Sequence, residues 1–189
     1  PADRWFAQLA ASADPRELSL LAFHVDYWDE IGWPDRFAQH AFTVRQSHRV
    51  RAQGSTTIYT PQVMVSSQLG LRWNQPSQVA AAIASIQRQP ATHSLRLRAR
   101  PESTHWMVDL DALPTPAGAG EGQLYLALYE NALTSNVRAG ENAGVTLHHE
   151  RVVRGLWGPW PVSTARHLQV VPPPQAKAAQ LGLTAFVQD

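Results

Sequence analysis

The chain has 189 residues, of which 44% are hydrophobic and 8% aromatic, enough for one large domain or two small ones with packed cores. Its 16 basic and 15 acidic side chains leave a formal charge of +1, so no overall field favours nucleic acid or an anionic membrane. It contains no cysteine, which excludes disulfides, thiolate zinc sites and thiol nucleophiles within these residues. No apolar run reaches the roughly 18 residues of a membrane-spanning helix, so we expect no membrane span. Because the net charge is near zero, we also expect no nucleic-acid partner.

The first predicted elements are a helix and a buried strand. Trp5, Phe6 and Leu9 recur at helical spacing over residues 4–13, and the helix is expected to end at the Asp-Pro pair that follows. Residues 18–25, "LSLLAFHV", form a continuous apolar run of strand length. Such a run is typical of a strand that is buried on both faces of a sheet.

A second helix, two strands and a third helix are predicted next. Residues 34–53 carry apolar side chains on one helical face and end before a glycine that suits a helix C-terminus. Residues 56–67, "TTIYTPQVMVSS", and 69–73, "LGLRW", are expected to form two adjacent strands. Residues 76–87, "PSQVAAAIASIQ", begin with a proline in the first helical turn and predict the third helix.

The second half of the chain is predicted to be mostly β. Residues 93–100, "HSLRLRAR", alternate strictly, and residues 105–111 and 123–130 are also strand-like. Residues 156–161, "LWGPWP", are interpreted as a turn at the end of a sheet pair. We therefore expect an α/β domain at residues 1–90, followed by a β-sandwich-like domain at residues 91–189.

The Thr60-Pro61 pair stands directly before a predicted strand, although proline donates no hydrogen bond to a sheet. The order helix, strand, helix, strand with a Thr-Pro entry, strand and helix resembles the thioredoxin fold with its first strand removed. In that fold the X-Pro bond is cis, and an extended chain pairs with the backbone beside it. The resemblance therefore implies a cis Thr60-Pro61 bond and a protein or peptide substrate in a groove at Pro61.

Several longer segments resemble a family of secreted bacterial thioredoxin-like proteins of unassigned function. They are "PADRWFAQLA", "AFHVDYWDEIGWPDRFA", "AFTVRQ", "YTPQVMV", "GENAGVTLHHERVVR" and "AFVQD". In that family a C-S-S-C-P-P-A-D motif opens the first helix, and Pro1, Ala2 and Asp3 match its last three letters. The resemblance implies a periplasmic or secreted protein with a thiol-disulfide redox role, whose paired cysteines precede Pro1.

The missing cysteines determine what this chain is expected to do. A thiol at a helix N-terminus has a lowered pKa and reacts as a thiolate, but none is present here. We expect the cysteine-free chain to be inactive in thiol exchange and to need no cofactor. The alternative hypothesis is a non-catalytic module that binds a peptide or an envelope partner. Within this chain, the start of a helix is a sufficient reason for Pro1 and Asp3, without any redox motif.

The resemblance also places a strand between residues 18–26 and residues 58–65. We expect these two segments not to pair directly, and expect an upstream strand or another chain to lie between them. Tyr59, Thr60, Pro61, His24, Asp26 and Trp28 are the predicted substrate-binding residues, with the last three near the Pro61 end of the sheet.

Other interpretations of polar residues carry less weight. A metal held by the cluster of His24, Asp26 and Asp29 together with His48 is an alternative, but a hydrogen-bonded structural His24 is favoured. The adjacent His148 and His149 point to opposite faces of a strand, so they do not suit one metal. Arg96, Arg98 and Arg100 share a strand face that is interpreted as solvated.

Overall fold

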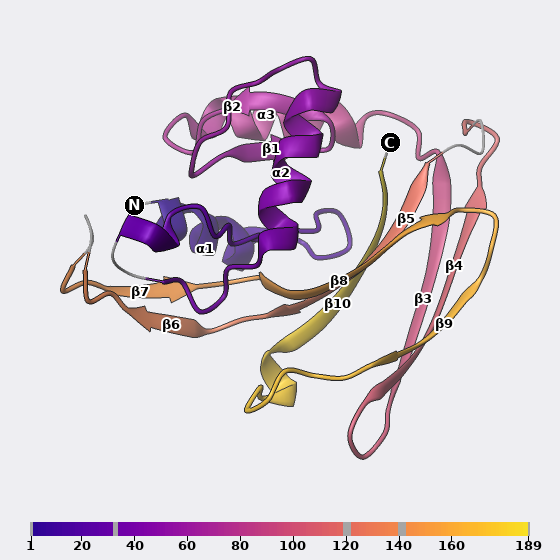
Figure 1. Cartoon of the computed structure of the whole chain (residues 1–189). Helices are drawn as coiled ribbons and strands as arrows, with labels where there is room; N and C mark the ends of the chain where they lie inside the picture. Colours follow the sequence, from indigo (N-terminus) through magenta and orange to yellow (C-terminus); the bar gives the residue numbers. More distant parts are fainter. Residues whose placement is uncertain (1, 32–33, 119–121, 140–142, 189) are drawn as a thin grey trace. The chain divides into compact units, whose positions relative to one another are not determined.

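The computed structural model describes residues 2–31, 34–118, 122–139 and 143–188. These residues divide into two compact units (Figure 1). The first unit contains Pro1–Gln87 and Glu130–Val153, and the second contains Arg88–Tyr129 and Arg154–Asp189. The division differs from the predicted domains at residues 130–153, which belong to the first unit although they were expected in the second. No helix in the described residues is long and apolar enough to cross a membrane.

In its described residues, the first unit combines three α-helices with two small antiparallel sheets. Its elements in chain order are α1 (Ala2–Ser12), the short 3-10 helix η1 (Asp29–Ile31), α2 (His40–Ala52), β1 (Val63–Val65), β2 (Gln68–Leu71), α3 (Pro76–Gln87), β6 (Leu133–Asn136) and β7 (Thr146–His149). β1 pairs with β2, and β6 pairs with β7. The bounds of α3 are those of the helix predicted at residues 76–87, which is confirmed.

The predicted strand at residues 18–26 is wrong. This segment forms one isolated parallel bridge, between Ala22 and Val152, in which Ala22 and Val153 donate backbone hydrogen bonds. After Ala22, the backbone of the segment forms hydrogen bonds with other residues. Gln39 donates its N–H to the His24 carbonyl, and Asp26 donates its N–H to Thr43 Oγ1. No pairing between this segment and residues 58–65 occurs in the described part of the chain. The segment is half-buried, whereas the sequence predicted burial on both faces.

α2 begins at His40, six residues later than predicted. Asp35 explains the delay, because its carboxylate accepts the N–H of Phe37 at 2.9 Å and its carbonyl accepts the N–H of Ala38 at 2.9 Å. A local Asp bond of this kind stabilises a turn in competition with a helix. The predicted strand at 56–67 is likewise shortened to Val63–Val65.

One apolar core cluster of the first unit lies between helices and the β1–β2 pair. Leu71, Val79 and Ala82 are buried, and Trp5 of α1 and Ile83 of α3 pack against them. Val63 and Val65 of β1 complete the contact. α1 and α3 therefore share a core with the strand that follows Thr60.

The second unit contains two three-stranded sheets. One has the order β3 (His93–Pro101), β4 (Trp106–Pro114), β9 (Arg166–Val170), and the other has the order β10 (Leu181–Gln188), β5 (Gln123–Glu130), β8 (Val152–Pro161). Inward positions alternate along β4 and β5, where Val108, Leu110, Leu124, Leu126 and Leu128 are almost fully buried. Both sheets contribute to this one apolar cluster.

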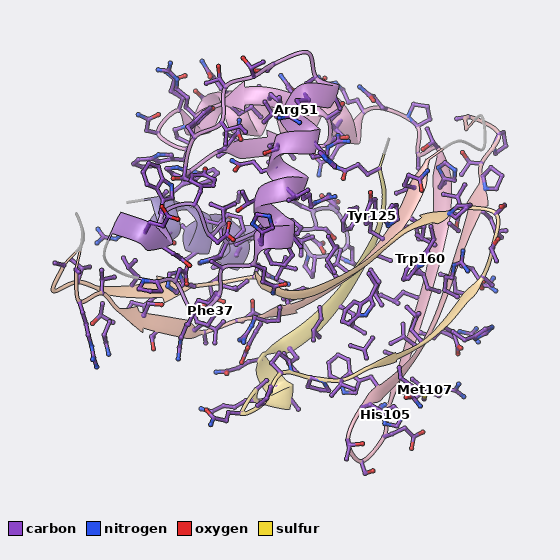
Figure 2. All side chains as sticks on the ribbon, viewed as in Figure 1. Phe37, Arg51, His105, Met107, Tyr125 and Trp160 are labelled. Atoms are coloured by element: carbon purple, nitrogen blue, oxygen red, sulfur yellow. The ribbon has the colours of Figure 1, made fainter. Side chains whose placement is uncertain are left out.

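The interpretation of residues 156–161 as a turn is wrong, because they form the end of β8. Trp157 and Trp160 pack against the apolar cluster of the second unit, and the labelled Trp160 is visible in Figure 2. Long-range packing of two tryptophans thus outweighs the local turn signal of Gly158 and Pro159.

Charges on the β3–β4–β9 sheet are matched across the strands. The register places Arg96 opposite Asp111 and Arg98 opposite Asp109. Asp109 also lies 3.3 Å from Arg100 and 2.7 Å from His167. The bond from His167, with the nearby arginines, lowers the pKa of Asp109. The arginine row is therefore accompanied by carboxylates on the neighbouring strand.

Candidate functional site

The register of the β1–β2 pair creates a pocket beside Thr60. Val63 is paired with Leu71, so the residues just before Val63 lie next to those just after Leu71. The resulting open pocket has a volume of about 470 Å³ and is lined by Tyr59, Thr60, Pro61, Gly70, Arg72, Trp73 and Asn74. We call it the Thr60 pocket. Three of the predicted substrate-binding residues, Tyr59, Thr60 and Pro61, thus meet in it.

The Thr60-Pro61 peptide bond is cis, as the sequence analysis predicted. The Thr60 and Pro61 side chains are exposed, and Tyr59 is half-buried. β1 has β2 on one edge, and no second strand partner for β1 occurs in the described residues. Thr60 and Pro61 are therefore accessible to solvent at the entrance to β1.

Trp28 connects the η1 region to the Thr60 pocket. Its indole Nε1–H donates a 2.7 Å hydrogen bond to Thr60 Oγ1, and 47% of the side chain is exposed. Tyr27 contacts the Trp28 ring at a centroid distance of 5.4 Å, and burial raises the pKa of Tyr27. Trp28 is thus held in place at its polar edge while much of its apolar ring faces solvent.

A glutamine on α2 holds the chain segment that leads into the pocket. Gln46 Nε2 donates to the Tyr59 carbonyl at 3.1 Å and to Gln62 Oε1 at 2.7 Å. Gln46 Oε1 accepts the Tyr27 hydroxyl at 3.2 Å. One side chain therefore fixes the two segments that carry Trp28 and Thr60.

Asp26 is held by side chains of α2, and it makes no hydrogen bond or ion pair with the described residues that line the Thr60 pocket. Its carboxylate accepts a 2.5 Å hydrogen bond from Thr43 Oγ1, and His40 Nδ1 lies 3.0 Å from its other oxygen. The Thr43 bond, with the His40 contact adding to it, lowers the pKa of Asp26. We interpret Asp26 as the carboxylate that anchors the 24–28 segment to α2, rather than as a pocket wall.

His24 lies in a different group of side chains, which we call the His24 cluster: His24, Asp35, Phe37, Ser135, His149 and Asp3. The carboxylate of Asp35 accepts a hydrogen bond from His24 Nδ1. The His24 ring meets the His149 ring edge to face at 5.2 Å, and Phe37 contacts both rings at 5.7 and 5.6 Å. Figure 2 labels Phe37 beside the β6–β7 hairpin. Among the described residues, no hydrogen bond or ring contact joins His24 to Trp28 or Thr60.

The His24 cluster contains two carboxylates with lowered pKa values. Burial would raise the pKa of Asp35, but the hydrogen bond and charge of His24 and the N–H of Phe37 outweigh it, so the pKa lies below its usual value. The adjacent His149 ring lowers the pKa of Asp3 against the opposing effect of burial. Both aspartates are therefore ionised at neutral pH.

His149 is buried between Ser135 and α1. Its Nε2 forms a 3.1 Å hydrogen bond with Ser135 Oγ, and its Nδ1 lies 3.4 Å from Asp3 Oδ1 without hydrogen-bond geometry. The order Ser, His, Asp resembles that of a hydrolase triad. However, Ser135 is only 4% exposed, so a substrate carbonyl has no route to its oxygen. We interpret the cluster as structural; His149, which sequence analysis set aside, fixes the β6–β7 hairpin to α1.

Metal binding has no geometric support here. No group of three or more His, Asp or Glu side chains suited to a metal ion occurs in the described residues. Of the predicted helix-start residues, Ala2 and Asp3 open α1, and Pro1 lies outside the described residues.

Sequence reasoning missed the residues that arrive from distant segments. Thr43 and Gln46 are one turn apart on α2, and their shared helical face was a usable signal. Arg72 and Trp73 were assigned only to a strand, and they line the Thr60 pocket because of the β1–β2 register. No local pattern marks Asp35 and His149 as neighbours of His24.

Comparison with known proteins identifies a family. The sequence profile described as "Protein of unknown function (DUF1223)" matches residues 1–188. The chain belongs to the DUF1223 family. The solved structure of protein AGR_C_4864 from Agrobacterium tumefaciens superposes with a TM-score of 0.66 at 19% identity, covering 100% of this chain and 87% of that one. This DUF1223 chain therefore shares its mixed α/β fold with that protein. No protein with a curated description matches the chain.

Proposed function

We propose that this DUF1223 chain binds an extended polypeptide at the Thr60 pocket, as the substrate-holding part of a secreted or periplasmic thioredoxin-like protein with a thiol-disulfide role. The observation that carries the proposal is the hydrogen bond from the indole of Trp28 to Thr60, a residue that lines the pocket. An exposed, fixed indole beside an accessible strand entrance suits a peptide that pairs with backbone and rests a side chain on an aromatic ring.

The arrangement of the first unit supports a thioredoxin-like interpretation. α1 and α3 share a core with β1 and β2, and the 18–26 segment contacts α2 through the edge-to-face rings of Phe23 and Phe42. The segment and β1 are not paired with each other in the described residues, as expected if a further strand lies between them. The β-rich second unit corresponds to the proposed sandwich-like domain.

Binding is tested with short extended peptides that carry a fluorophore, by fluorescence anisotropy. Trp28→Ala is expected to weaken binding about tenfold, because it removes the ring contact together with the hydrogen bond to Thr60. Trp28→Phe keeps an aromatic ring and should lose only a few-fold. Leu113→Ala, a change at a 59% exposed apolar residue of the second unit, serves as the control. Equal binding by all four proteins would refute the proposed site.

The redox part is tested separately. The 189-residue chain should not reduce or oxidise a disulfide substrate, since thiol exchange needs a thiolate and the chain has no cysteine. Joining a Cys-Ser-Ser-Cys-Pro segment before Pro1 should create exchange activity that a Ser-for-Cys version lacks. Peptide binding without any exchange in the extended protein would favour the alternative function, a non-catalytic binding module.

A further inference from the structure

The residues that line the Thr60 pocket include one charged side chain, that of Arg72. Among its lining residues Arg72 is the only ionisable cation, and none of them is an aspartate or a glutamate. Tyr59 and Trp73 supply aromatic surface in the same pocket, and Asn74 supplies an amide. The described lining therefore combines a positive group, an additional hydrogen-bond donor and apolar ring surface.

Arg72 differs from several other arginines of the chain in lacking a partner. Arg16 binds Asp14 at 2.6 Å, Arg100 lies 3.3 Å from Asp109, and Arg36 donates to the Thr134 carbonyl at 2.8 Å. Arg72 makes no side-chain hydrogen bond or ion pair with any described residue. Its five N–H donors are directed by a planar fork whose geometry matches a carboxylate.

The position of Arg72 is fixed by the sheet. It directly follows Leu71, which is 5% exposed and belongs to the core cluster shared with α3. The same residue is paired with Val63, so Arg72 is held opposite the chain that leaves Pro61. A ligand group that lies along Tyr59 and Thr60 therefore comes within the range of this side chain.

We propose that the Thr60 pocket selects polypeptides that present a carboxylate, which Arg72 binds while Tyr59 and Trp73 contact the adjoining apolar part of the peptide. This inference rests on the proposed function, since it names the class of polypeptide held there. A charged hydrogen-bonded pair of this type is stronger and more directional than a neutral one. The carboxylate comes either from an Asp or Glu side chain or from a peptide C-terminus.

The test measures binding of labelled peptides that differ only in Glu or Gln at a central position, each with a free or an amidated C-terminus. The wild-type chain is expected to bind the Glu peptide about tenfold more tightly than its Gln counterpart, or the free C-terminus more tightly than the amide. The first result identifies a side-chain carboxylate as the ligand group, and the second identifies the terminal one.

Three variants determine whether Arg72 is responsible. Arg72→Gln should abolish the preference for the carboxylate, so that the peptide with the carboxylate and its uncharged counterpart bind this variant with equal affinity. Arg72→Lys keeps the charge but loses the fork, so an intermediate preference is expected. Arg51→Gln removes the same charge from the last turn of α2, outside the pocket lining, and should leave the preference intact (Figure 2). Unchanged circular dichroism confirms that each variant is folded.

The outcomes separate this inference from the function on which it rests. Equal binding of charged and uncharged peptides, unaffected by Arg72→Gln, would overturn the carboxylate preference and leave peptide binding standing. Arg51→Gln could also remove the carboxylate preference as fully as Arg72→Gln does. That result would show a general effect of charge and would overturn the inference that Arg72 binds the carboxylate. Failure of the folded wild-type chain to bind any peptide would refute the proposed function itself, and the carboxylate preference with it.

Discussion

The two units of the chain are stabilised in different ways. In the second unit, strands from two sheets share an apolar cluster, and alternate residues of β4 and β5 have almost no exposed surface. In the first unit, Phe42 and Val50 of α2 are almost fully buried, but α1 has no buried residue and neither does the 18–26 segment. Polar bonds, such as those from Thr43 to Asp26 and from Gln46 to Tyr59, hold the segments of the first unit in place.

This difference accords with the proposed function, in which the first unit binds the polypeptide. A continuous apolar core stabilises a unit largely through the burial of apolar surface. A unit whose segments are joined by side-chain hydrogen bonds keeps accessible edges and exposed aromatic rings, which are the features that a polypeptide-binding site requires. The following predictions test this comparison.

The largest effect is expected at the centre of the second unit. Leu126 is fully buried in β5, so Leu126→Ala should lower the free energy of unfolding by about 2–5 kcal/mol, through lost burial and a residual cavity. Leu21→Ala in the half-buried segment of the first unit should cost clearly less. Urea unfolding followed by circular dichroism measures both, with exposed Leu113→Ala as the control. Equal losses at Leu126 and Leu21 would contradict the comparison.

A smaller effect is expected at Gly182 of the second unit, where there is no space for a side chain. A Cβ built at Gly182 lies 2.2 Å from the Tyr129 ring, which is far inside van der Waals contact. Gly182→Ala should therefore destabilise the chain by about 1–3 kcal/mol. Tyr129→Leu in the same chain should recover part of that loss, because it removes the clashing ring. Urea unfolding of the four proteins gives the coupling, and strict additivity of the two changes would contradict the steric explanation.

The first unit should be the more sensitive to acid. Asp3 and Asp35 have pKa values below the ordinary 3.8, so each carboxyl binds its proton more weakly in the folded chain than in the unfolded one. Their contribution to stability is therefore present above about pH 4 and is lost as the pH falls through the lowered pKa values. Asp35→Asn should flatten the acid limb of a plot of urea midpoint against pH, whereas exposed Glu17→Gln should not. An unchanged acid limb in Asp35→Asn would rule out this role.

The smallest effect is a local change in ionisation. Thr43→Val removes the hydroxyl that donates to Asp26, so the pKa of Asp26 should rise towards its ordinary value. Carbon-detected NMR titration of the Asp26 carboxyl measures the change. Ser47→Ala, one turn further along α2, is the matched control, because it removes a hydroxyl that bonds the Thr43 carbonyl rather than Asp26. A pKa that stays lowered in Thr43→Val would assign the effect to His40.

The sequence by itself determined the elements whose signals are local. α3 was predicted from its first residue to its last, because Pro76 begins the helix and Val79 and Ile83 follow its apolar spacing. The alternation over residues 93–100 likewise predicted β3, since a strand between solvent and a core has a period of two. The Thr60-Pro61 pair was also recognised as a special position at the start of β1.

Only the tertiary structure decided which distant residues meet. Residues 18–26 have the composition of a buried strand, yet they meet β8 at a single bridge, between Ala22 and Val152, and their other hydrogen bonds include those to the region of α2. Arg72 reaches the Thr60 pocket through the β1–β2 register, and His149 reaches His24 through the β6–β7 hairpin. Periodicity reports which face of an element is apolar, but it carries no information about the partner that covers that face.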